Sequence, residues 1–242
     1  EINFKKILSL EPKFADAHYN LGIIYKNINN IEKSVYHYKE CIKFNPNKFE
    51  AYNNLGNIYL KKQDSKLAID NYLLCLEINP KYTTALQNFG VCIQNFKFTK
   101  QTPIIEKSII NLLDQNNILR PVDIINSVLD YLYLDKEFYE INRDIKYLEK
   151  NYLFEDLISC FLNNKIFMKL LKITPITDIK IEKVLRYLRY NILTNISRVR
   201  KKENVLEMIE GIASQCFINE YIYPVIPIEN ENIVKLEKKI KK

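Results

Sequence analysis

Three asparagines of this 242-residue chain recur at an interval of 34 residues: Asn20, Asn54 and Asn88. A side-chain amide offers a hydrogen-bond donor and an acceptor, so it can pair bidentately with an extended peptide backbone of any sequence. The neighbouring residues would make a surface lined by these amides polar to mixed in character: Tyr19, Ile23, Asn53, Asn57, Gln87 and Val91. If the fold brings the three amides onto one surface, we expect that surface to bind a peptide.

A second group that could bind a ligand is basic, and comprises Lys183, Arg186, Arg189, Arg198, Arg200, Lys201 and Lys202. The first three fall near one helical face and the others in the following loop, so they could form an electrostatic footprint for RNA or an acidic protein. Tyr187 and Tyr190 lie among them as stacking groups. A solvated helix face in a lysine-biased chain of net charge +7 explains the same residues, and we prefer that interpretation.

The residue inventory argues against catalysis by this chain. A nucleotide-binding or S-adenosylmethionine-binding loop needs a glycine-rich turn, and the four glycines are isolated: Gly22, Gly56, Gly90 and Gly211. The two histidines, His18 and His37, have no Cys or carboxylate at ligand spacing, so we expect packing or surface exposure rather than metal binding. The sequence predicts no catalytic residue, no cofactor and no metal.

The 34-residue interval extends well beyond the asparagines. The segment 17–22 aligns with 51–56 and 85–90, and further pairs keep the interval: Tyr25 and Tyr59, Tyr38 and Tyr72, Cys41 and Cys75, Pro46 and Pro80. Each unit has two apolar helical faces joined by a short polar turn, at 27–30 and 61–64. The repeated glycine lets the first helix approach its partner closely, at a cost of about 1 kcal/mol in helix propensity.

A period of 34 with Asn-Leu-Gly, an aromatic, a small residue and a closing proline resembles the tetratricopeptide repeat. The resemblance implies helical hairpins that stack into a superhelix, with the first helix of each unit lining a concave groove. It places the three asparagines along that groove, as in the tetratricopeptide arm of the O-linked N-acetylglucosamine transferase family. Asn before Leu-Gly is also common in the family, which explains the asparagines without a ligand.

We expect an all-α chain: a tetratricopeptide helical-hairpin superhelix followed by a non-repeating helical region. Residues 1–119 form the array, with one partial, two full and one degenerate repeat, and residues 120–242 form an α-helical domain of unknown role. Thr102-Pro103 predicts the start of a helix that ends near Asp114. Phe4, Ile7 and Pro12 lie 34 residues before Tyr38, Cys41 and Pro46. The chain therefore opens inside an earlier repeat, and we expect the natural protein to extend upstream.

The second region shows helical spacing without the period. A helix is expected from Pro121, and a second apolar stripe runs from Phe138 to Tyr152. Residues 157–173 form either one buried helix or two helices broken at Asn163-Asn164. Thr177 or Asp178 can cap the next helix, and a charged helix over 229–242 ends the chain.

The segments 170–178, 185–193 and 215–221 are similar to the helical segment of bacterial proteins that carry tetratricopeptide repeats before a class I methyltransferase domain. That resemblance implies the substrate-recruiting arm of a longer S-adenosylmethionine-dependent methyltransferase, with the catalytic domain outside this chain.

Our first hypothesis is a non-catalytic scaffold that binds an extended peptide or a partner helix in the groove. The alternatives are the recruiting arm of a longer transferase and RNA binding through the basic group, which we disfavour. No apolar run reaches the ~18–20 residues that span a bilayer. Five cysteines without Cys-x-x-Cys favour a reduced, cytoplasmic compartment.

Overall fold

The computed structural model describes residues 1–115, 117–143, 154–194 and 203–218. Within these ranges the regular elements are thirteen α-helices and no strand, which confirms the all-α prediction. Contacts divide the chain into two units. One unit comprises residues 1–97 and 102–120, and the other comprises residues 98–101 and those from 121 onward. Whether the two regions expected from the sequence are separate domains stays a prediction.

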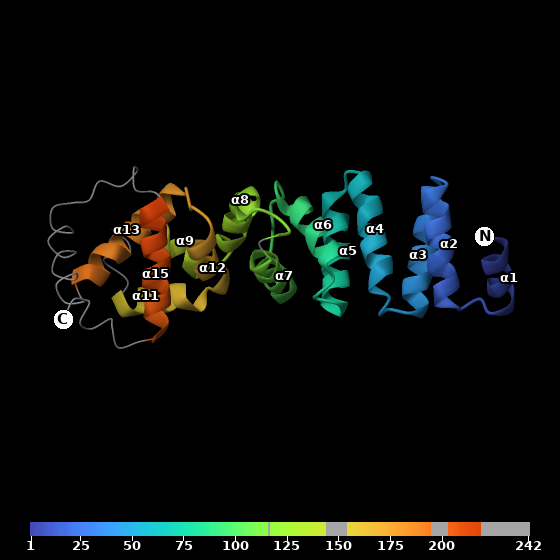
Figure 1. Ribbon diagram of the computed structural model, residues 1–242, viewed down its shortest axis with the longest axis horizontal. Coiled ribbons are helices and arrows are strands. Elements are labelled where there is room, and N and C mark those ends of the chain that lie inside the picture. The colour runs from blue at the N-terminus through green and yellow to red at the C-terminus, as the bar shows by residue number, and fades with distance from the viewer. Residues whose placement is uncertain (116, 144–153, 195–202, 219–242) are drawn as a thin grey trace. The chain divides into compact units, whose positions relative to one another are not determined.

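The first unit is built from helical hairpins (Figure 1). Its helices are α1 (Ile2–Leu10), α2 (Ala15–Asn27), α3 (Ile31–Phe44), α4 (Phe49–Lys61), α5 (Ser65–Ile78), α6 (Thr83–Ile93) and α7 (Pro103–Asp114). The two full repeats are the α2–α3 and α4–α5 hairpins. In each, the second helix follows the first after a short connection. The tetratricopeptide helical-hairpin fold expected from the repeat pattern is therefore present.

The turn inside each hairpin is built in the same way. Asn29 and Gln63, 34 residues apart, both adopt a left-handed backbone, with φ of 58° and 62°. The N–H of Asn30, the next residue, donates to the carbonyl of Tyr25 at 2.8 Å, and the equivalent bond recurs one repeat later. In each repeat this hydrogen bond satisfies a carbonyl in the last turn of the first helix, as in a Schellman motif.

The residue after the left-handed position begins the second helix. The side chain of Asn30 accepts a hydrogen bond from the backbone of Lys33, and Asp64 does the same for Leu67. Each cap satisfies one of the N–H groups that a helix start leaves without an intrahelical partner. The polar turn predicted from the sequence thus ends one helix and starts the next within a few residues.

Close helix packing explains the repeated glycines. A Cβ added to Gly22 would lie 2.6 Å from the ring of Tyr38, and one added to Gly56 would lie 2.5 Å from the ring of Tyr72. Both tyrosines have no exposed surface. The ring occupies the space that a side chain would fill, so the predicted close approach is confirmed.

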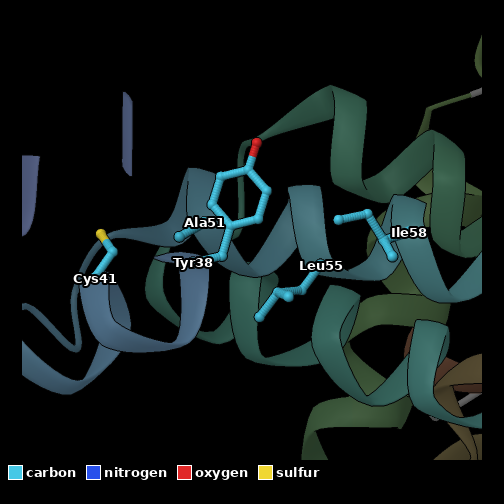
Figure 2. Packing of buried hydrophobic residues seen from close by; sticks show 5 residues of the cluster. All are labelled: Tyr38, Cys41, Ala51, Leu55 and Ile58. Carbon is cyan, nitrogen blue, oxygen red and sulfur yellow. The ribbon is translucent and has the colours of Figure 1, made fainter. Parts of the chain in front are cut away.

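The core continues from one repeat to the next. Figure 2 shows Tyr38 and Cys41 of α3 with Ala51, Leu55 and Ile58 of α4, which together form one buried cluster. The second helix of one hairpin thereby packs on the first helix of the following hairpin. A single hairpin could not bury both of its faces, and stacking gives each repeat the partner that it needs.

The third repeat departs from this pattern, as the sequence predicts. A Cβ on Gly90 would meet Leu112 of α7 at 3.1 Å, and no tyrosine ring is among its nearest atoms. The side chain of Thr102 accepts a hydrogen bond from the N–H of Ile105 at 3.4 Å, with Pro103 at the first helical position. The predicted N-cap of α7 is confirmed.

The second unit contains α8 (Pro121–Leu132), α9 (Lys136–Ile141), α11 (Phe154–Asn163), α12 (Lys165–Ile173), α13 (Ile179–Thr194) and α15 (Glu203–Ile218). Two helices cover residues 157–173, and Asn164 caps the second, so the two-helix alternative is confirmed. Asp178 caps α13 by accepting from the N–H groups of Lys180 and Ile181. Helix α9 ends at Ile141, earlier than its apolar stripe predicts, and the stripe from 144 onward and the helix predicted over 229–242 lie outside the described residues.

Buried contacts between distant segments hold this unit together. The rings of Phe138, Phe161 and Phe167 meet with centroids 4.9–6.2 Å apart. The side chain of Gln215, 2% exposed, accepts from the N–H of Ile176 at 2.9 Å and donates to the backbone carbonyls of Leu171, in the last turn of α12, and of Thr174, which follows that helix. This amide satisfies the loop's backbone groups, which would otherwise be buried without a partner.

Candidate functional site

The asparagines predicted to line the groove lie on α2, α4 and α6, the first helices of successive repeats, and all three are partly exposed. The Nδ2 of Asn54 donates to the hydroxyl of Tyr19 at 3.4 Å. One repeat later, the Nδ2 of Asn88 donates to the Oδ1 of Asn53 at 3.2 Å. Both donors and both acceptors are 34 residues apart, so the same contact joins α4 to α2 and α6 to α4.

Asn57 gives the second of these contacts a fixed orientation. Its Oδ1 accepts from the hydroxyl of Tyr72 at 2.7 Å and from the Nδ2 of Asn88 at 3.0 Å. The oxygen of Asn57 is therefore engaged inside the molecule, and its amide N–H groups make no hydrogen bond to the described residues. In Asn88 the amide N–H groups are engaged, and the oxygen makes no hydrogen bond to the described residues.

Asn20, the first of the three asparagines, is placed differently. The Nδ2 of Asn20 donates to the backbone oxygen of Asp16, one turn earlier in its own helix, at 2.8 Å. The oxygen of Asn54 lies 3.5 Å from the Nζ of Lys26. Thus each amide makes an intramolecular hydrogen bond through its nitrogen, and the oxygens of Asn20 and Asn88, which accept none from the described residues, are acceptors to which a ligand could bind.

The neighbouring residues of the predicted surface differ in exposure. Asn53 is 4% exposed, and Tyr19 and Ile23 are half-buried against the core cluster between the two repeats. Gln87 and Val91 of α6 are exposed. The structure therefore brings Asn53, Asn57 and Asn88 together. Among the neighbouring residues, the exposed side chains are those of Gln87 and Val91 on α6.

Lys48 is a residue of this surface that the sequence analysis missed. Its Nζ lies 4.9 Å from the centre of the Tyr19 ring and 3.0 Å from a carboxylate oxygen of Asp16. The hydrogen bond to Asp16 raises the pKa of Lys48, so the amine stays cationic. The 34-residue pattern could not indicate it, because Phe14 and Tyr82 occupy the equivalent positions.

The reactive side chains of the first unit are engaged in packing. Cys41 and Cys75 are fully buried free thiols, and burial raises their pKa values to about 11 and 12. They therefore lack the thiolate that nucleophilic chemistry requires. His18 and His37 contact each other. Within the described ranges no group of three or more His, Cys, Asp or Glu could hold a metal ion.

The basic group of the second unit is described only in part. Lys183, Arg186 and Arg189 lie on α13, where the first two are exposed and the third is half-buried. The other four members, Arg198, Arg200, Lys201 and Lys202, lie outside the described residues. RNA binding through this group stays a prediction.

Comparison with known protein families matches the first unit alone. Three protein-family models match: one described as TPR repeat over residues 28–63, and two described as tetratricopeptide repeat over residues 3–36 and 49–82. No curated protein matches the chain. The similarity to methyltransferase-containing proteins finds no support in these matches. Among the described helices, none is long and apolar enough to cross a membrane.

Proposed function

We propose, from the premise that residues 3–82 are tetratricopeptide repeats, that this array binds an extended peptide of a partner protein across α2, α4 and α6. Tetratricopeptide repeats generally mediate protein–protein interactions and are generally not catalytic, so a scaffold role is the function that the family suggests. The peptide and the surface that it contacts are our proposal.

The observation that carries the proposal is the amide cluster of Asn53, Asn57 and Asn88. Hydrogen bonds inside the molecule hold Asn57 with its N–H groups available and Asn88 with its oxygen available. A peptide residue in an extended conformation offers one carbonyl and one N–H, which match this donor and acceptor. Because the amides are already oriented, binding loses less side-chain entropy than it would with freely rotating side chains.

The same chemistry favours an extended peptide over a partner helix. A helix uses its backbone N–H and carbonyl groups internally, so it offers these amides no partner except at its ends. An extended segment keeps its backbone groups available, and the amides can bond to them without regard to sequence. Specificity would then come from side chains that contact the exposed residues of α6, Gln87 and Val91.

A binding experiment with defined peptides tests the proposal. Peptides selected from a random displayed library on the 1–242 protein are measured by fluorescence anisotropy against the native protein and the Asn20→Ala/Asn54→Ala/Asn88→Ala variant. We expect the variant to bind at least tenfold more weakly, since it removes the two available acceptors, of Asn20 and Asn88, each hydrogen bond contributes about 1 kcal/mol, and tenfold corresponds to about 1.4 kcal/mol. Equal affinity for both proteins would contradict the proposed site.

Asn71→Ala is the matched control. Asn71 lies on α5, the second helix of its repeat, and its Nδ2 donates to the backbone oxygen of Leu67 at 2.8 Å, as Asn20 does within α2. Its substitution removes the same local bond away from the proposed surface and should leave affinity unchanged. N-methylation of successive peptide nitrogens should weaken binding at the positions that face the amide oxygens, which separates backbone recognition from side-chain contacts.

A further inference from the structure

His18 of α2 and His37 of α3 face each other across the first hairpin. Their Nδ1 atoms are 3.0 Å apart, and the Nε2 of His18 lies 3.1 Å from the backbone oxygen of Pro12. His18 is 5% exposed and His37 is half-buried. The peptide-binding proposal uses neither residue.

These contacts determine where the protons of the pair reside. A carbonyl oxygen can only accept, so the Nε2 of His18 carries a proton that it donates to Pro12. The Nδ1 of a neutral His18 is then an acceptor. Two nitrogens 3.0 Å apart form a hydrogen bond only with one proton between them, so His37 must donate from its own Nδ1. The neutral pair is fully satisfied on the side where the two rings meet.

Aromatic rings partly bury His37, and nearby positive charges act on it. The Tyr25 ring of α2 stacks on it with centroids 5.3 Å apart, and Tyr36 of α3 contacts it edge-on. The charged groups that act on His37 are Lys5 of α1 and Lys33 and Glu40 of α3, of which only Glu40 favours protonation. Burial is the largest influence, followed by His18, and the pKa of His37 is lowered to about 4.

His18 is enclosed more completely. Its ring contacts that of Phe44 with centroids 5.7 Å apart, and its second nitrogen is held by Pro12. With a single added proton, the two Nδ1 atoms can still share an N–H⁺···N hydrogen bond, whereas protonation of both rings would place two N–H groups against each other at 3.0 Å and the bond would be lost.

We propose that the His18–His37 pair is an acid-sensitive latch, which holds α2 and α3 together while the two rings share a hydrogen bond and releases the first hairpin when both rings are protonated. When both rings are protonated, neither Nδ1 can accept, and two positive charges face each other in a half-buried site beside two lysines. That state favours the open hairpin, in which both imidazoles reach water.

The direction and range of the effect follow from the lowered pKa. The open hairpin binds more protons than the closed one between the ordinary histidine value of 6.5 and the lowered value of about 4. The latch is therefore fully effective above pH 6.5 and weakens as the pH falls toward 4. Because His37 retains partial exposure, we expect roughly a tenfold rise in the open population of the hairpin between pH 7 and pH 5.

The second repeat provides an internal control, because Tyr52 and Asn71 occupy the positions of His18 and His37 there. Hydrogen exchange of the native protein is measured at pH 7 and pH 5 and normalised to intrinsic rates. Protection of α2 and α3 should fall about tenfold on acidification, and protection of α4 and α5 should fall much less. Equal changes in the two hairpins would overturn the proposal.

The variant His18→Tyr/His37→Asn transfers the second repeat's pair into the first hairpin. It should abolish the difference in pH dependence between the hairpins, whatever its effect on stability at neutral pH. A ¹H–¹⁵N spectrum of the native imidazoles gives an independent reading that requires no variant. At pH 7 His37 should be neutral and carry its single proton on Nδ1. A His37 imidazole that is positively charged at that pH would contradict the proposal.

Discussion

The two full repeats share one framework and differ in the polar groups attached to it. In both, a glycine of the first helix packs under a buried tyrosine, and a left-handed residue closes the turn. The hydroxyl of Tyr72 donates to Asn57, whereas the hydroxyl of Tyr38 has no hydrogen-bond partner in the described part of the chain. Ile23 stands where Asn57 would be, one repeat earlier.

This difference separates what builds the fold from what distinguishes one repeat from the next. The glycine, the tyrosine ring and the turn recur because each hairpin has the same gap to fill and the same chain reversal to make. The hydroxyl partner does not recur, and a polar network grows in the second repeat where the first keeps an apolar contact. We therefore expect the same substitution of the repeated glycine to act alike in both repeats and substitutions of the polar groups to act differently.

The largest effect should come from filling the space under the tyrosine. Gly22→Ala and Gly56→Ala each place a Cβ within 2.6 Å of a buried ring, so we expect a loss of about 1–3 kcal/mol in the free energy of unfolding, from urea titrations followed by circular dichroism. Gly90→Ala meets the flexible ends of Leu112 at 3.1 Å and Leu119 at 3.4 Å and should stay within about 0.5 kcal/mol of the native protein, since alanine also favours the helix. Equal losses at all three glycines would contradict a framework specific to the full repeats.

The tyrosine hydroxyls should give an intermediate effect with a clear contrast. Tyr72→Phe removes the donor to Asn57 and should cost about 1 kcal/mol in unfolding free energy. Tyr38→Phe removes a buried hydroxyl without a partner among the described residues and should be neutral or stabilising. The comparison can be sharpened in an Ile23→Asn background, where Tyr38→Phe should become costly if the new amide reaches the hydroxyl.

The smallest effect should come from the turns. Gln63 adopts a left-handed backbone with φ of 62°, so Gln63→Gly should raise the unfolding free energy by about 0.5–1 kcal/mol. Asn29→Gly should gain less, because asparagine tolerates that conformation better than glutamine does. Thermal melts of the two variants beside the native protein measure the difference, and a destabilised Gln63→Gly would count against the shared turn.

Much of the first unit could be predicted from the sequence because its physics is local and repeated. The 34-residue interval, the polar turns, the cap at Thr102 and the space required by Gly22 and Gly56 all depend on nearby residues or on one neighbouring helix. The break at Asn163-Asn164 is local too, and the interpretation as two helices is confirmed. The role of the asparagines in peptide binding stays a prediction.

Other features depend on which distant side chains meet, and no period indicates them. His18 and His37 lie at nearly equal distances on either side of the hairpin turn, and this spacing is the one signal by which their contact could have been found. The buried amide of Gln215 carried no comparable signal, because it satisfies backbone groups of a loop about 40 residues away.

The sequence by itself determined the helical class, the repeat and the positions of the turns, because these follow from apolar spacing, glycine and capping residues. Only the tertiary structure decided which way each amide points, which histidine donates and which tyrosine hydroxyl lacks a partner. These depend on single hydrogen bonds between helices, whose geometry is settled only when the hairpins are packed against one another.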